Sequence, residues 1–135
     1  MHFSKYNKKM ALCSIICAIL FALLPLVTPQ VSAQQFSSRK QKSDFEQFEK
    51  FRTINRDSAY VYAERLVNDV DSTTVGSNIA QLYDFMAEYH ETSLHSYNKA
   101  LSYRLKSARI YEALDDIPCL TRTNALLGRI YLRNG

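Results

Sequence analysis

Apolar side chains after residue 43 recur at steps of three and four, which predicts a series of amphipathic helices rather than strands. The longest such stretch spans residues 96–116. Its apolar face is predicted to comprise Tyr97, Leu101, Leu105, Ala108, Tyr111 and Leu114. Small residues on this stretch, at Ala100, Ser107 and Ala108, would let another backbone approach closely. We expect the chain to be organised around this central helix.

Helices are predicted on both sides of it. A helix of about ten residues should begin with a capping box at Ser43 and Glu46 and bury an aromatic edge that includes Phe48. A second helix should run from an N-cap at Asp57 to about residue 70.

After a turn cluster over 71–76, a third helix should cover residues 77–91. Its inner face is predicted to comprise Ile79, Leu82, Met86 and Tyr89. Pro118 suits the first position of the last helix. No stretch alternates as a half-buried strand does, so the fold class is predicted to be all-α.

An internal repeat supports this organisation. Four positions of the second helix match four of the central helix at an offset of 37 residues, and the first two pairs are the same residue types. The matched sets are Tyr60, Ala63, Val67 and Val70, and Tyr97, Ala100, Arg104 and Ser107.

Residues 57–135 also resemble the tetratricopeptide (TPR) repeat family. The second-helix pattern of that family, an aromatic residue, Lys-Ala-Leu and then a small residue, matches Tyr97, Lys99-Ala100-Leu101 and Ser107. Its first-helix signature matches Leu127, Gly128 and Tyr131. Arg104 departs from the apolar or aromatic residue usual in the family, and the repeat spacing is longer than the usual ~34 residues.

The resemblance implies antiparallel helix pairs stacked as a short TPR-like α-solenoid of about 2.5 repeats, the last one incomplete. The residues expected to pack the repeats together are Tyr97, Ala100, Leu101, Ser107, Ala108, Leu127, Gly128 and Tyr131. The resemblance also implies a concave groove lined by first-helix positions. These are Asp84, Glu88, Ala125, Arg129 and Arg133. Such acids beside bases could equally be a solvated face with interhelical ion pairs of ~0.2–1 kcal/mol.

The first 33 residues have the order of a secretory signal peptide: three lysines, an apolar run over 10–27, and small residues up to a cleavage site after Ala33. The alternative is an uncleaved anchor, but 18 helical residues reach about 27 Å against a ~30 Å hydrocarbon core. We therefore expect a signal over 1–33, a polar linker over 34–42, and a helical repeat region over 43–135. The location would be periplasmic or extracytoplasmic, with a membrane tether if the signal remains.

Removing the signal changes the charge and cysteine arguments. The whole chain carries +4, but three of its 17 basic residues lie in the signal, which leaves 14 against 13 acidic residues. No basic stripe remains to bind nucleic acid. Of three cysteines only Cys119 remains, so no internal disulfide can form. We expect it to pack as a small apolar side chain rather than act as a reactive thiol.

Catalytic chemistry is not predicted. His90 and His95 are near Glu88 and Glu91 in sequence, but two histidines across a helix end do not converge as metal ligands must. With three glycines in the whole chain, a phosphate-binding Gly-rich loop is absent. We therefore expect no enzyme activity and no metal or other cofactor.

These observations lead to an exported scaffold that binds protein or peptide. One alternative is the extracytoplasmic sensory input of a membrane-spanning histidine kinase or helix-turn-helix regulator, in which a missing C-terminal part crosses the membrane. Another is a small self-assembling helical protein. The last helix has an apolar flank that includes Leu126 and Ile130 and lacks a partner helix in the sequence. We expect truncation of a longer protein to explain this, with a homo-oligomer contact as the alternative.

Overall fold

The computed structural model describes residues 36–134, and these residues form five α-helices and no strand. The helices are α2 (Arg39–Phe51), α3 (Arg56–Asp69), α4 (Ser77–Thr92), α5 (Tyr97–Ala113) and α6 (Ile117–Asn134). The all-α prediction is confirmed. The predicted signal peptide, its cleavage site at Ala33 and the start of the linker lie outside the described residues.

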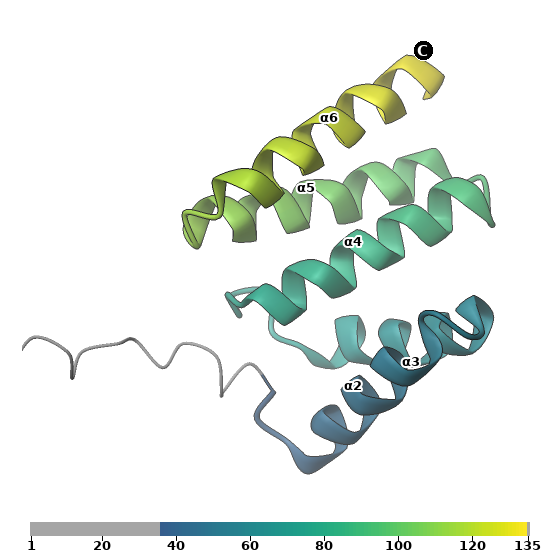
Figure 1. Cartoon of the computed structure of the whole chain (residues 1–135), viewed down its shortest axis with the longest axis vertical. Helices are drawn as coiled ribbons and strands as arrows, with labels where there is room; N and C mark the ends of the chain where they lie inside the picture. Colours follow the sequence, from purple (N-terminus) through teal and green to yellow (C-terminus); the bar gives the residue numbers. More distant parts are fainter. Residues whose placement is uncertain (1–35, 135) are drawn as a thin grey trace, which may run out of the picture. The chain divides into compact units, whose positions relative to one another are not determined.

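Consecutive helices run antiparallel and pack in chain order, α2 on α3, α3 on α4, α4 on α5 and α5 on α6 (Figure 1). The described residues 36–134 belong to one compact unit. Packing between sequence neighbours is the organisation of an α-solenoid, in which each helix pair depends mainly on the pairs beside it. The helix pairs are thus stacked as a short α-solenoid. None of the described helices is both long and apolar enough to cross a bilayer.

Small residues allow the helices to approach closely. Ala63 on α3 and Ala100 on α5, which match in the internal repeat, are both completely buried. The predicted inner face of α4 is also buried, from Ile79 through Met86 to Tyr89. Larger side chains such as Phe48 and Leu66 fill the space between helices, so burial of apolar area supplies most of the stability.

The helix α2 begins five residues earlier than predicted. The Ser38 hydroxyl accepts the backbone N–H of Gln41 at 3.0 Å, and the Gln41 side chain accepts the N–H of Ser38 at 3.2 Å. The capping box is therefore at Ser38 and not at Ser43, and residues 39–42 of the predicted linker are helical. Phe36 is buried against the ring of Phe45, 4.8 Å away, which fixes the chain before the helix starts.

The N-cap of α3 also differs from the prediction. Asn55, not Asp57, accepts a backbone N–H, that of Ser58 at 3.0 Å. Asp57 instead accepts the hydroxyl of Tyr89 on α4 at 2.7 Å. Both residues are suitable caps, and the tertiary bond to Tyr89 explains why Asp57 has another role.

The buried face of α5 is rotated from the predicted one. Leu105 is 39% exposed, and Tyr97, Leu101 and Ala108 are half-buried. The buried side chains of α5 are Ala100, Arg104, Ser107, Ile110 and Tyr111. Of these, Tyr111 belongs to the predicted apolar face, and Ala100 and Ser107 are predicted packing residues. The physical reason is that α5 packs against both α4 and α6. In addition, polar side chains of α5 are buried because they bind an acidic side chain of α4.

Two predicted packing residues of α6 are exposed. A Cβ added at Gly128 would meet nothing within 4 Å, so this glycine is not at a close helix contact, and Tyr131 is 55% exposed. Leu127 and Ile130 are buried. Within the described residues α6 packs on α5, and the face with Gly128 and Tyr131 has no helix against it.

Candidate functional site

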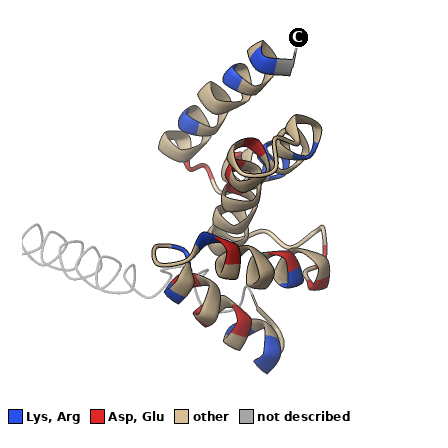
Figure 2. Cartoon of the chain, turned by 90° about the vertical axis from the view of Figure 1, so that its right-hand side faces the viewer, with Lys and Arg blue, Asp and Glu red and all other residues tan. Residues whose placement is uncertain are grey.

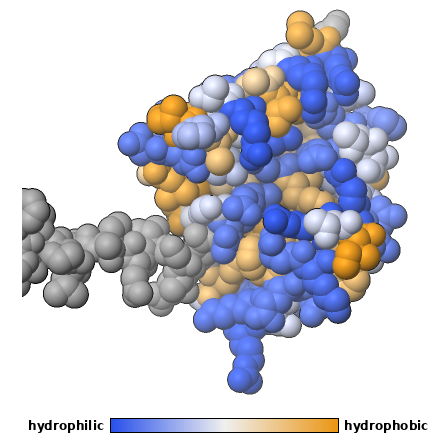
Figure 3. Space-filling view, in the orientation of Figure 1, coloured by the Kyte–Doolittle hydropathy of each residue, from blue (hydrophilic) through white to orange (hydrophobic). Residues whose placement is uncertain are grey.

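An open groove with a volume of ≈ 670 Å³ is lined mainly by α2, α4 and α6, the first helices of the stacked pairs. The second helices contribute Arg56 at the start of α3, and Arg104 and Tyr111 from α5. Alternate helices of a solenoid lie on the same side, so residues far apart in sequence meet there. Figure 3, in the orientation of Figure 1, shows a mostly hydrophilic surface with smaller apolar areas between.

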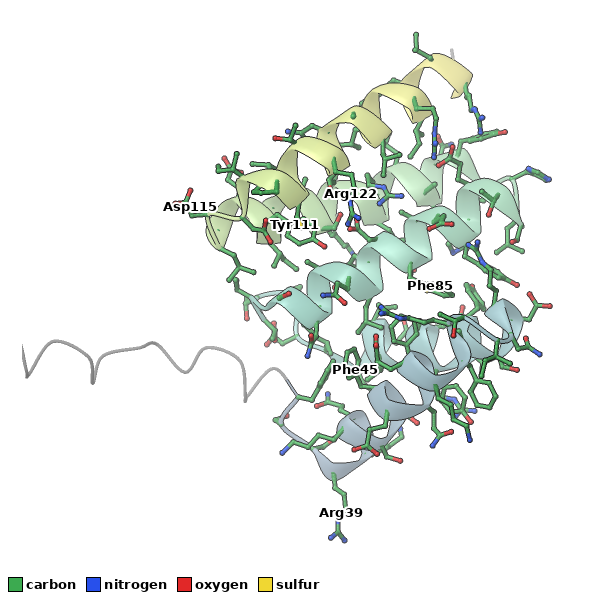
Figure 4. All side chains as sticks on the ribbon, viewed as in Figure 1. Arg39, Phe45, Phe85, Tyr111, Asp115 and Arg122 are labelled. Atoms are coloured by element: carbon green, nitrogen blue, oxygen red, sulfur yellow. The ribbon has the colours of Figure 1, made fainter. Side chains whose placement is uncertain are left out.

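Asp84 on α4 is the centre of the hydrogen-bond network in this groove. Its Oδ1 accepts from Nη1 of Arg104 at 2.7 Å and from the hydroxyl of Ser107 at 2.7 Å. Its Oδ2 accepts from the hydroxyl of Tyr111 at 3.0 Å and from Nη2 of Arg122 at 3.5 Å. Figure 4 shows Tyr111 and Arg122 between α4 and α6.

The spacing of the three donors on α5 explains this geometry. Residues 104, 107 and 111 are separated by three and four, so they lie in one row on the helix. That row faces Asp84, which therefore joins α4 to both α5 and α6. Ser107 was predicted to be a small packing residue, and it is fully buried, but it also donates this hydrogen bond.

The charge of Arg104 is buried, since only 3% of its side chain is exposed. Its Nε has no hydrogen-bond partner in the described structure. Transfer of a guanidinium into a protein interior is costly unless a carboxylate compensates it, and Asp84 is that carboxylate. Burial, and then the charge of Asp84, raise the pKa of Tyr111, so this phenol remains a hydrogen-bond donor.

A second carboxylate on α4 holds α6. The side chain of Glu91 is completely buried and accepts from Arg129 at 2.9 Å and from Arg133 at 3.0 Å. Asp84 and Glu91 are two helical turns apart, and so are Arg122 and Arg129, so each acid is 38 residues before its arginine. The two helices are therefore joined by ion pairs at two levels. Figure 2 shows the basic residues of α6, the helix at the C-terminal end, in blue.

The predicted groove residues fall into two groups. Asp84 and Glu88 line the groove, whereas Ala125, Arg129 and Arg133 do not. The sequence placed Arg129 and Arg133 beside acids of the preceding first helix, but the acid they bind is Glu91 rather than a groove residue.

The sequence analysis did not identify three arginines of the groove: Arg52 directly after α2, Arg56 on α3 and Arg122 on α6. A periodic signal existed for Arg122, because its offset from Asp84 equals that between Arg129 and Glu91. Arg56 donates to Glu88 at 3.0 Å across the groove, and no regular spacing in the sequence indicates this bond.

The floor of the groove between α2 and α4 is aromatic. The ring of Phe85 contacts that of Phe48 edge-on with centroids 5.1 Å apart, and the guanidinium of Arg56 lies 5.9 Å from the centroid of Phe85 (Figure 4). Cys119 at the start of α6 lines the groove as a half-buried side chain. Burial, followed by a hydrogen bond with Asp116, raises the pKa of its thiol and makes the nucleophilic thiolate scarcer.

The two histidines near the α4–α5 turn occupy different environments. His90 is buried and stacks on Tyr103 with centroids 5.4 Å apart, and its Nδ1 has no hydrogen-bond partner in the described part of the chain. Burial, reinforced by the charge of Lys99, lowers the pKa of His90. His95 is exposed and has a positive φ of 50°. No cluster of three or more metal-ligating side chains occurs among residues 36–134.

Comparison with models of known protein families, with curated proteins and with solved structures finds no match to this chain. The resemblance to TPR repeats therefore stays a prediction from the residues quoted above.

Proposed function

We propose that the chain is an exported scaffold that binds a protein or peptide segment in the groove across α2, α4 and α6. The observation that supports this most is the groove itself, whose volume of ≈ 670 Å³ lies within the range of ligand-binding sites. Side chains from several helices converge there, so a ligand would contact all the stacked pairs together.

The chemistry of the lining also favours recognition of a peptide. The ring of Phe85, packed on the buried ring of Phe48, offers an apolar surface. The guanidinium groups of Arg52, Arg56 and Arg122 offer hydrogen-bond donors around it. An extended peptide presents both apolar side chains and acceptor groups at short intervals. The predicted signal over residues 1–33 supports the proposal that binding takes place outside the cytoplasm.

Selection of peptides from a random display library against the purified full-length chain tests the proposal. Ser77→Trp would fill the groove, because Ser77 is one of its lining residues. Arg109→Trp places the same bulk on the exposed surface of α5, outside the groove, and is the matched control. We expect selected peptides to bind at least tenfold more weakly to the first variant and unchanged to the second. Equal binding to both variants would show that the groove is not the binding site.

A further inference from the structure

Most of the hydrogen-bonding capacity of Asp84 is used by α5, which supplies three donors to a carboxylate with about four acceptor sites. Arg104, Ser107 and Tyr111 donate to its two oxygens at 2.7, 2.7 and 3.0 Å. The charge of Asp84 is balanced by Arg104, whose buried side chain has no other acid within ion-pair distance in the described structure. Arg122 is therefore a fourth donor to a carboxylate whose charge is already balanced by Arg104.

The geometry of Arg122 agrees with this. Its distance to Asp84 is 3.5 Å, at the limit of a hydrogen bond, and 64% of its side chain is exposed. A contact of this length is weak and easily replaced, because its donor is exposed and its acceptor carries three shorter hydrogen bonds. The guanidinium can therefore form its two parallel hydrogen bonds with another carboxylate.

The other arginines of the groove have acids of their own. Arg56 binds Glu88 at 3.0 Å, and Arg52 lies 3.1 Å from Glu49. The remaining acid of the groove, Asp116, accepts the backbone N–H of Cys119 at the start of α6. Arg122 is therefore the groove arginine without an acid of its own, since it shares Asp84 with the closer Arg104.

An apolar surface lies within the same groove, since Leu126 lies one helical turn after Arg122 and Phe85 is on the facing helix α4. A ligand held by Arg122 would therefore place its neighbouring groups against apolar side chains. A peptide with an acidic side chain beside an aromatic or aliphatic one has this pattern.

We infer that the groove selects an extended peptide in which an acidic side chain adjoins an apolar one, and that Arg122 leaves Asp84 to bind the acid. This inference rests on the proposed function, because it names the ligand class of the same groove. Arg122 is then the residue that sets specificity, while Asp84 keeps the groove in shape.

The test uses a random display library of peptides with blocked ends and three forms of the full-length chain: wild type, Arg122→Gln and Arg109→Gln. Arg109 is an exposed arginine outside the groove and serves as the matched control. We expect peptides selected by the wild type and by Arg109→Gln to be enriched in acid–apolar pairs. Peptides selected by Arg122→Gln should lack that enrichment.

The affinity of one selected peptide then gives the magnitude. Replacing its acid by the corresponding amide should weaken binding to the wild type roughly ten- to hundredfold and leave binding to Arg122→Gln nearly unchanged. Equal thermal melts of the variants would establish that Arg122→Gln is folded. Groove-dependent peptides without acidic enrichment, or a preference that survives in Arg122→Gln, would overturn the inference while the proposed function stands. A selection that yields no groove-dependent peptide would overturn both.

Discussion

Replacement of Asp84 by Asn should destabilise the fold far more than a similar change one helical turn away. Asn has the size of Asp, so the change removes the charge without opening a cavity. It leaves the guanidinium of Arg104, with 3% of its side chain exposed, without a counter-charge. It also puts an amide N–H₂ among groups that are themselves donors, Ser107 and Tyr111.

Breaking a buried ion pair in this way costs about 3–5 kcal/mol of unfolding free energy. A domain of this size has roughly 5–15 kcal/mol in total, so the variant should lose about a fifth or more of its stability. Glu88→Gln is the matched control. Its ion pair with Arg56 has side chains that are 50% and 44% exposed, so its loss should cost only ~0.2–1 kcal/mol.

Urea unfolding of the full-length chain, followed by the far-ultraviolet circular dichroism of its helices, measures both differences. The double variant Asp84→Leu/Arg104→Leu separates an uncompensated charge from a general loss of packing. It removes both partners, so it should recover much of the stability lost in Asp84→Asn. If Asp84→Asn cost no more than Glu88→Gln, the buried network would not hold the helices together and our reasoning would be wrong.

Two further predictions concern other parts of the fold. The lowered pKa of His90 means that the unfolded chain binds a proton more readily than the folded one. The stability of the fold should therefore be full above pH ~6.5. Below that pH it should decrease by up to ~1.4 kcal/mol per pH unit. Midpoints of thermal unfolding between pH 7 and pH 5 should show this decrease in His95→Asn, the control at an exposed site. The decrease should be smaller in His90→Gln. Equal pH profiles of the two variants would contradict the assignment of the pH dependence to His90. Gly128→Ala should stabilise the chain by ~0.5–1 kcal/mol in urea unfolding, because the added methyl group enters open space on a helix. Destabilisation would mean that this face of α6 is covered.

The sequence predicted the helical elements well because their apolar spacing is a local property. The boundaries of α4 differ from the prediction by one residue, and its inner face is the predicted one. The N-termini were harder to predict, because Ser38 and Ser43, or Asn55 and Asp57, are equally able to cap a helix. Tertiary contacts of Phe36 and Tyr89 decided between them.

The groove could be predicted only in part. Asp84 and Glu88 were found through the resemblance to a repeat family, but the residues of α5 that bind Asp84 were not. Periodicity of apolar residues cannot detect a face that is buried and polar, and Arg104 with Ser107 forms such a face. The register between α4 and α6 depends on which arginine meets which acid, and several arginines of α6 had a suitable spacing.

The residues that contact Asp84 differ in burial, and this difference affects how the surface could change during evolution. A substitution at Asp84 or Arg104 disturbs the buried contact between α4 and α5, so these positions tolerate little variation without loss of the fold. Arg122, being mostly outside that network, can be replaced at small cost to stability. Descendants of such a chain could therefore acquire new binding partners through one exposed position while the buried network stayed the same.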